Sequence, residues 1–158
     1  MTNRNVNVYT LIKPEIIKLR KVGIKTAILD CRLLLSKSLG SKLTLYNHEN
    51  VNISKNEVEH FKTLIVQRLS GKPVSRIINK RDFWKKEFKL NEETLDPRPD
   101  SETLIESVLE HYRDKLQALK ILDLGSGSGC LGLSLLDEYH NSKVSFLDIS
   151  EKSLEIVK

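Results

Sequence analysis

The chain has 158 residues, of which 30% are charged and 39% hydrophobic, the balance of a folded protein rather than of a disordered segment. Its formal net charge of +5 comes from scattered Lys and Arg, which permits an acidic or nucleic-acid-associated partner without demonstrating one. No apolar run approaches the roughly 18–20 residues of a membrane helix and no secretory signal is evident, so we expect a cytoplasmic protein without membrane contact.

Helical periodicity dominates the N-terminal part of the chain. Three stretches carry it, each closed by a glycine, at 14–23, 26–40 and 54–71. Pro14 suits the first turn of the first helix, and Ser54 opens the last one with the capping box SKNE. Because such short helices are stable only when they pack together, we predict a helical bundle over residues 1–73.

A different pattern follows over residues 74–99. The runs 76–78 and 83–90 are rich in β-prone residues and predict a β-hairpin between two domains. We expect its aromatic pair, Phe83 and Trp84, to pack within the hairpin rather than to stack on a ligand. The sequence DPRPD then predicts an extended linker that leads into a helix capped by Asp100 or Ser101.

The C-terminal part, residues 100–158, alternates between strand and helix. From Lys120 the order is KILDL, GSGSG, CLGLSLLDEY, KVSFLD and SEKSLEIVK, which predicts strand, glycine loop, helix, strand and helix. This is a βαβ unit and the start of a doubly wound sheet, so we predict an α/β protein whose last domain is Rossmann-like and incomplete.

The glycine loop indicates a site for a nucleotide-like cofactor. A loop between a strand and a helix presents bare backbone N–H groups and a positive helix end, and glycine lets a ligand approach closely. Asp123 lies inside the strand before the loop, and Asp148 ends the next strand. An acid at that second position can accept hydrogen bonds from a ribose diol.

Three interpretations of the loop compete. Residues 127–132, GSGCLG, match the dinucleotide pattern GxGxxG, but its first glycine should stand at the strand end, where this chain has Gly125. A plain tight turn would also use glycines. The sequence DLGSGSG instead resembles the first motif of S-adenosylmethionine-dependent methyltransferases, an interpretation that we favour. Its candidate cofactor-binding residues are Asp123, Gly125, Ser126, Gly127, Ser128, Gly129 and Asp148.

No other catalytic or metal-binding pattern stands out. Ser126 and Ser128 lack the GxSxG context and a convincingly placed histidine base. Cys31 and Cys130 lie far apart, outside any CxxC pair or zinc-ligand spacing, which argues for a reducing compartment. We expect both cysteines to be buried thiols.

Three further segments are similar to the HemK/PrmC family of release factor glutamine N5-methyltransferases. They are AILDCRLLL at 27–35, GKPVSRIINKRDFW at 71–84 and TLDPRPDSE at 94–102. Together with the glycine loop they follow the family order along essentially the whole chain. Asn79 stands where the family usually has glycine in a turn; because asparagine tolerates a positive φ, we expect the turn to survive.

This resemblance implies a specific reaction. A helical domain would help to dock a class 1 peptide chain release factor, and a Rossmann-like domain would bind S-adenosyl-L-methionine. The methyl group would pass to the glutamine side-chain amide of the Gly-Gly-Gln motif, with no direct nucleic acid contact expected. By position, Gly125 to Gly129 would wrap the methionine portion of the cofactor, and Asp148 would hold its ribose.

The chain departs from the family in one important respect. The Asn-Pro-Pro-Tyr motif that contacts the substrate amide is absent, so no catalytic residue is assigned. We therefore expect a truncated member that binds cofactor weakly and transfers no methyl group alone. The alternatives are a methyltransferase acting on adenine N6 or an rRNA base, and a non-catalytic remnant that binds release factors.

Overall fold

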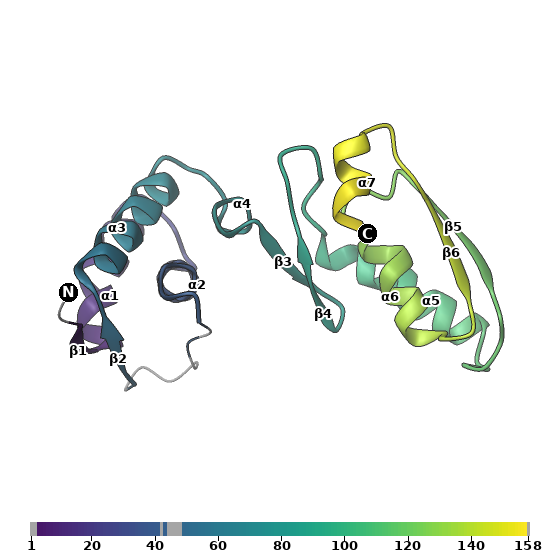
Figure 1. Ribbon diagram of the computed structural model, residues 1–158, viewed down its shortest axis with the longest axis horizontal. Helices are drawn as coiled ribbons and strands as arrows, with labels where there is room; N and C mark the ends of the chain where they lie inside the picture. Colours follow the sequence, from purple (N-terminus) through teal and green to yellow (C-terminus); the bar gives the residue numbers. More distant parts are fainter. Residues whose placement is uncertain (1–2, 42, 44–48, 158) are drawn as a thin grey trace. The chain divides into compact units, whose positions relative to one another are not determined.

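The protein folds into two compact units, Met1–Ile78 and Asn79–Lys158, which are described separately (Figure 1). The computed structural model describes residues 3–41, 43 and 49–157. Within this described part, no helix is long and apolar enough to cross a membrane. The mixture of an N-terminal helical unit and a C-terminal α/β unit confirms the predicted fold class.

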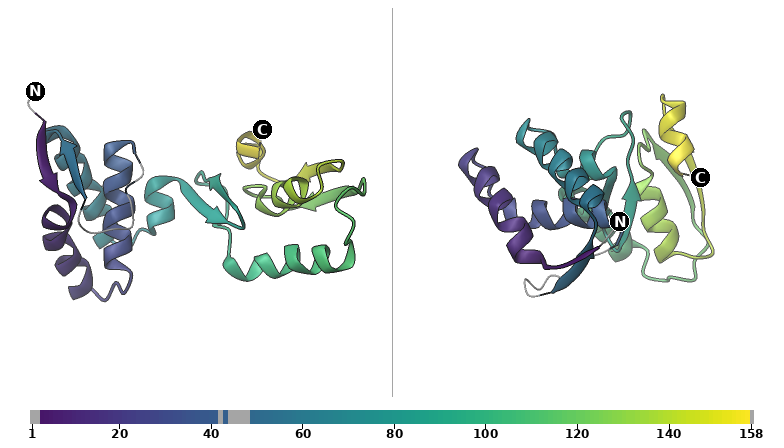
Figure 2. Two further views of the ribbon diagram at one scale, coloured as in Figure 1. Left: turned by 90° about the horizontal axis from the view of Figure 1, so that it is seen from below. Right: turned by 60° about the vertical axis from the view of Figure 1, so that its left-hand side comes forward.

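The first unit is a helical bundle with one small β-ladder (Figures 1 and 2). Its helices are α1 Val8–Lys21, α2 Ala27–Leu39, α3 Lys55–Leu69 and α4 Val74–Ile78. The strands β1 Arg4–Asn7 and β2 Asn50–Ile53 pair antiparallel, with Val6 opposite Val51. The sequence patterns did not predict these strands, because four residues of alternating Asn and Val are too short to identify one.

The start of the first helix differs from the prediction. Helix α1 begins at Val8, and the Oδ1 atom of Asn7 accepts hydrogen bonds from the backbone N–H groups of Tyr9 (3.0 Å) and Thr10 (3.3 Å). Pro14 therefore lies inside the helix on its exposed side rather than in its first turn. The N-cap at Asn7 lets the helix begin several residues before Pro14, although proline is ordinarily found in the first turn.

Helix α4 corrects a second prediction, that residues 76–78 form part of a hairpin. The carbonyl of Pro73 accepts hydrogen bonds from the backbone N–H groups of Arg76 and Ile77, both at 3.1 Å, so the segment is helical despite its β-prone composition. Proline is well suited to open such a turn, since it has no N–H group of its own to satisfy. Asn79 follows with a φ of 57°, as expected for asparagine at a turn.

The helices of the first unit enclose one hydrophobic core. It is formed mainly by Val8, Ile12, Ile16, Leu19, Ala27, Cys31, Leu34, Leu35, Ile53, Phe61, Leu64, Ile65 and Ile77. Burial, followed by the nearby carboxylates of Glu15 and Asp30, raises the pKa of the Cys31 thiol to about 12. Cys31 is therefore a packed, unreactive thiol, as predicted.

A buried ion pair connects two helices of this core. The Nε atom of Arg68 in α3 donates to Oδ2 of Asp30 in α2 at 2.7 Å, and the two side chains are only 18% and 6% exposed. A charge left without its partner in such a place is costly. The exposed pair Lys55–Glu59, 3.9 Å apart on α3, lacks this burial.

We predict that Asp30→Asn lowers the free energy of unfolding by about 2 kcal/mol, because the partly buried Arg68 guanidinium loses its counter-charge. The matched variant Glu59→Gln should lower it by less than about 0.5 kcal/mol, as is usual for exposed pairs. Urea denaturation followed by circular dichroism measures both. Equal effects would show that the Asp30–Arg68 pair does not stabilise the bundle.

The second unit begins with a hairpin and continues as a βαβ unit. The hairpin strands are β3 Lys80–Phe83 and β4 Lys86–Lys89. After a short 3₁₀ turn, Pro99–Ser101, come α5 Glu102–His111, β5 Lys120–Leu124, α6 Cys130–Glu138, β6 Lys143–Leu147 and α7 Glu151–Val157. Strands β5 and β6 are parallel and in register, with Leu124 opposite Leu147.

The small sheet of β5 and β6 is covered on one face. Alternate residues, among them Asp123 and Phe146, face α6 at Gly132. Helix α6 in turn packs against α5 (Figures 1 and 2). The opposite face leaves Leu122, Leu124 and Leu147 more than half exposed. Phe83, Phe88 and Ile105 form a second buried cluster that fixes the hairpin to α5, as the aromatic composition of the hairpin suggested.

Candidate functional site

The loop between β5 and α6 has the backbone conformation that requires its glycines. Gly125, Gly127 and Gly129 have φ values of 69°, 53° and 72°, in the left-handed region that other residues rarely adopt. A Cβ atom added at Gly125 or Gly127 would meet nothing within 4 Å, so both positions border open space. The glycines therefore provide both the turn and close access for a ligand to the backbone.

The loop is held against the end of β6. The backbone N–H groups of Gly125 and Ser126 both donate to the carbonyl oxygen of Leu147, at 2.8 and 3.1 Å. The N–H group of Gly129 donates to the carbonyl of Ser126 at 2.7 Å, which closes the loop before α6 begins. The sequence-predicted loop and the end of the second strand therefore lie side by side.

Asp148 lies at the centre of this arrangement. Its Oδ2 atom accepts the N–H group of Gly127 at 2.7 Å, and its Oδ1 atom accepts that of Ser150 at 2.9 Å. These backbone hydrogen bonds, that from Ser150 first, hold the pKa of the Asp148 carboxyl below its ordinary value. The residue is thus a carboxylate at neutral pH, and it keeps spare lone pairs for a further hydrogen-bond donor.

Asp123 has a different environment from Asp148. Its Oδ2 atom accepts the backbone N–H group of Gly132 at 2.9 Å, in the first turns of α6. Burial is the main cause that raises the pKa of the Asp123 carboxyl. The side chain connects β5 to α6 beneath the loop, where its observed role is to fix the helix start.

The two loop serines are almost fully buried. Ser126 and Ser128 are 7% and 5% exposed, and the Oγ atom of Ser126 has no hydrogen-bond partner among the described residues. Burial, partly offset by a hydrogen bond with Ser128, raises the pKa of Cys130 at the start of α6. The described residues contain no cluster of three or more His, Cys, Asp or Glu residues that could hold a metal ion.

Gly132 and Val157 support the loop but were not among the predicted site residues. A Cβ atom on Gly132 would lie 2.5 Å from Cε1 of Phe146 and 2.9 Å from Oδ2 of Asp123, so α6 can approach the sheet only because this residue is glycine. Val157 of α7 would lie 2.9 Å from a Cβ atom on Gly129. The GxGxxG match over 127–132 already contained the signal for Gly132, since the last glycine of that pattern permits close helix–strand packing.

Taken together, the site offers open backbone at two glycines and an ionised carboxylate within hydrogen-bond distance of the loop. The N–H group of Gly132 in the first turn of α6 already donates to Asp123. A ligand with hydroxyl donors, such as a ribose, can bind to Asp148, and the rest of that ligand can lie against the open backbone of Gly125 and Gly127.

We predict that Gly132→Ala lowers the free energy of unfolding by about 1–3 kcal/mol, the usual cost of overpacking. In an ordinary helix interior, a change from Gly to Ala would stabilise the protein by about 1 kcal/mol. A destabilised Gly132→Ala variant would therefore indicate the close contact between α6 and the sheet. Ser134→Ala, in the same helix, is the control: it removes a buried hydroxyl without a described partner and should be neutral or stabilising. Thermal and urea denaturation test both variants; a stabilised Gly132→Ala would contradict the close contact.

Models of two protein families match the chain, one in each unit. Residues 16–78 match the PrmC N-terminal domain, and residues 95–158 match the methyltransferase small domain. These matches confirm the family resemblance found in the sequence, in the same order along the chain.

Several curated proteins are similar over most of the chain. A release factor glutamine methyltransferase of Bradyrhizobium diazoefficiens is 35% identical over 144 residues, which cover 89% of this chain and 48% of that protein. A release factor glutamine methyltransferase of Leptospira interrogans is 32% identical over 151 residues, which cover 95% of this chain and 53% of that protein. A bifunctional methyltransferase of Rickettsia prowazekii is 33% identical over 159 residues, covering 89% and 31%. The chain thus spans about half the length of the first and second of these relatives and less of the third.

Proposed function

We propose, because the chain belongs to the HemK/PrmC family of methyltransferases, that its second unit binds S-adenosyl-L-methionine as a methyl donor. The observation that carries this proposal is the contact between Asp148 and the glycine loop, with Oδ2 of Asp148 2.7 Å from the backbone nitrogen of Gly127. It places an ionised carboxylate beside an open, glycine-lined backbone. This is the pair of groups that a ribose and a methionine tail require.

The proposed cofactor residues divide into two groups by their surroundings. Gly125 and Gly127 border open space and can face the methionine portion, with Asp148 as acceptor for the ribose hydroxyls. Ser126, Ser128, Gly129 and Asp123 are proposed to shape the loop from behind, since their observed contacts or burial lie on the protein side. When bound, the cofactor supplies an electrophilic methyl sulfonium.

The proposed methyl acceptor is the glutamine side-chain amide of the Gly-Gly-Gln motif in class 1 release factors. An amide nitrogen is a weak nucleophile because its lone pair is delocalised, so the reaction depends on positioning and on hydrogen bonds that shift electron density toward nitrogen. The relatives' name, release factor glutamine methyltransferase, supports this substrate. The Asn-Pro-Pro-Tyr segment that would hold the amide is not among these 158 residues.

The first unit is proposed to help dock the release factor. Lys and Arg outnumber Asp and Glu over residues 1–78, whereas the reverse holds over residues 79–158. The charge difference favours an acidic surface on the partner of the first unit. We retain the functional division into a docking domain at 1–73, a linker at 74–99 and a cofactor domain at 100–158 as part of this proposal.

We predict that Asp148→Asn weakens S-adenosylmethionine binding at least about tenfold, because an amide presents one acceptor oxygen and no charge to the ribose. Asp82→Asn removes the same charge from an exposed hairpin position and should leave affinity unchanged. Isothermal titration calorimetry with the whole chain measures both variants. Equal affinity of wild type and Asp148→Asn would exclude the proposed role of Asp148.

The pH dependence of cofactor binding provides an independent check. The pKa of Asp148 lies below its ordinary value of 3.8, and the ionised form is the one that accepts the hydrogen bonds. Binding should therefore be constant from pH 7 to about 4, and should fall only as the pH drops through the lowered pKa. A loss of binding centred at pH 5 or above would show that another group controls the site.

The activity itself is tested by methyl transfer. A polypeptide of these 158 residues is expected to bind labelled S-adenosylmethionine weakly and to transfer no label to a purified class 1 release factor. Addition of a polypeptide that carries the Asn-Pro-Pro-Tyr half of a relative should restore labelling of the Gly-Gly-Gln glutamine. Robust labelling by the 158-residue chain alone would contradict the assignment of the amide-binding role to that missing segment.

A further inference from the structure

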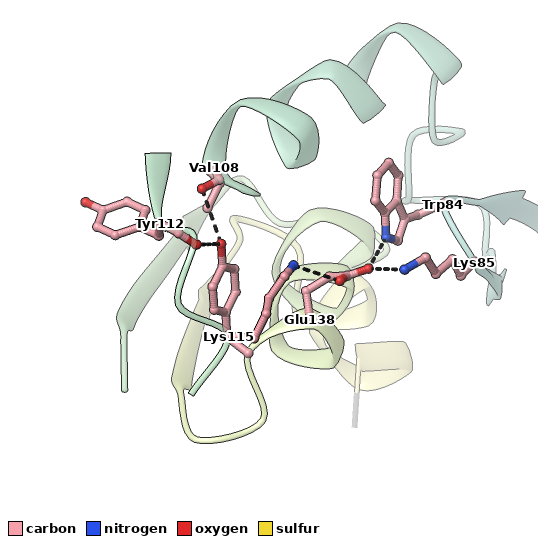
Figure 3. Close-up of polar contacts among 7 residues, drawn as sticks. Trp84, Lys85, Val108, Tyr112, Lys115 and Glu138 are labelled. Carbon is pink, nitrogen blue, oxygen red and sulfur yellow. Dashed lines mark hydrogen bonds and ion pairs between the residues drawn. The ribbon is translucent and has the colours of Figure 1, made fainter. Parts of the chain in front are cut away.

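A cluster of polar contacts around Glu138 lies outside the glycine loop. Glu138 is the last residue of α6, and its Oε1 atom accepts hydrogen bonds from Nε1 of Trp84, at 2.8 Å, and from Nζ of Lys85. Its Oε2 atom accepts one from Nζ of Lys115 at 3.0 Å (Figure 3). The side chain is only 12% exposed, so three donors from two separate segments converge on one largely buried carboxylate.

The position of this carboxylate conflicts with local helix energetics. Helix α6 ends in Asp137 and Glu138, with no basic residue in its last turn, although the negative end of a helix disfavours acids. The conflict is resolved by two consecutive lysines of the hairpin, Lys85 in its turn and Lys86 at the start of β4. Lys85 pairs with Glu138, and Lys86 pairs with Asp137 at 2.6 Å.

The hairpin turn is itself strained and held at a second point. Trp84 has a φ of 54°, in the left-handed region that a bulky side chain rarely adopts. Its backbone N–H group donates to Oε1 of Glu102, the first residue of α5, at 2.7 Å. The segment 84–102 is therefore closed at its two ends by the hydrogen bond between Trp84 and Glu102. Trp84 thus donates to two carboxylates, with its backbone N–H group to Glu102 and with its indole N–H group to Glu138.

The far part of this closed segment contacts the helix that follows Asp148. Nδ2 of Asn91 donates to the backbone carbonyl of Lys152 in α7 at 2.7 Å, and the Lys152 ammonium lies 3.8 Å from the Glu93 carboxylate. Val157 of the same helix lies against Gly129 of the glycine loop. Contacts through residues 84–102 and α7 thus connect the hairpin turn to Gly129, at the end of the glycine loop.

We propose that Glu138 is a positioning residue, which fixes the hairpin turn at Trp84 and thereby holds residues 84–102 and α7 in place beside Asp148. Ordinary exposed ion pairs stabilise little, but the Glu138 side chain is only 12% exposed and accepts hydrogen bonds from three donors. Its hydrogen bonds, led by that from Lys85, lower the pKa of Glu138 to about 2, so the anchor stays ionised at physiological pH.

The chain offers a direct probe, because Trp84 is its single tryptophan. Glu138→Gln keeps the shape of the side chain but removes the charge that attracts both lysines. We expect a red-shifted Trp84 emission, stronger acrylamide quenching, and faster hydrogen exchange over residues 84–102 and α7. Asp137→Asn, which disrupts only the more exposed Lys86 pair, should leave all three nearly unchanged.

The effect on the cofactor site rests on the proposed function and is measured separately. If α7 positions Asp148, Glu138→Gln should weaken S-adenosylmethionine binding at least about fivefold, the lower end of typical coupling between sites. Lys115→Gln is a second variant that removes one donor and leaves the helix intact; it should move every readout in the same direction, by less.

The possible outcomes are distinct. Unchanged Trp84 emission and quenching in Glu138→Gln would contradict the claim that Glu138 fixes the hairpin turn. Altered emission with unchanged hydrogen exchange in α7 would show that Glu138 makes only a local contact and does not position α7. Should the wild-type chain bind no cofactor, the proposed function fails, while hydrogen exchange in α7 still decides the role of Glu138. If Glu138→Gln does not fold, Lys115→Gln decides between these outcomes by the same measurements.

Discussion

Parallel pairing of β5 and β6 is the constraint on which the candidate site depends. Because parallel strands end at the same edge of a sheet, the in-register pairing of Leu124 with Leu147 brings the residues that follow each strand together. The strand pairing by itself therefore places the glycine loop next to Asp148. The carbonyl of Leu147 receives two loop N–H groups, and the Asp148 carboxylate receives a third.

Helix α6 connects this edge of the sheet to the rest of the second unit. At its start, Gly132 allows the helix to approach the sheet closely enough for Asp123 to accept its N–H group. At its end, Glu138 pairs with Lys85 of the hairpin turn and Asp137 with Lys86 of β4. One nine-residue helix therefore contacts the candidate cofactor loop at one end and the hairpin turn at the other.

The first unit relies on a different kind of stabilisation. Its core is a single apolar cluster of helices, and the pair of Asp30 and Arg68 adds a fixed connection between α2 and α3 within it. Removal of one partner of such a pair is costly, because the other charge is then left largely buried without a counter-charge. The excess of positive charge in this unit is consistent with the docking role proposed for it.

The sequence alone determined the order of the main elements and the place of the glycine loop between a strand and a helix. Capping at Ser54, the strand–loop–helix–strand pattern and the positive φ at Asn79 all follow from local chemistry, and the structure confirms them. The positions of Asp123 and Asp148 near the loop also followed, because the parallel strands of a βαβ unit end at the same edge of the sheet.

Only the tertiary structure decided which residues of the loop border open space and which are buried against the rest of the fold. The strands β1 and β2, the start of α1 before Pro14 and the helix over 74–78 were not predicted, since each depends on a partner distant in sequence or on a cap that outweighs local propensity. The same holds for Glu138. Its sequence context disfavours an acid at a helix end, and the reason for it, a tryptophan and two lysines from other segments, appears only once the chain is folded.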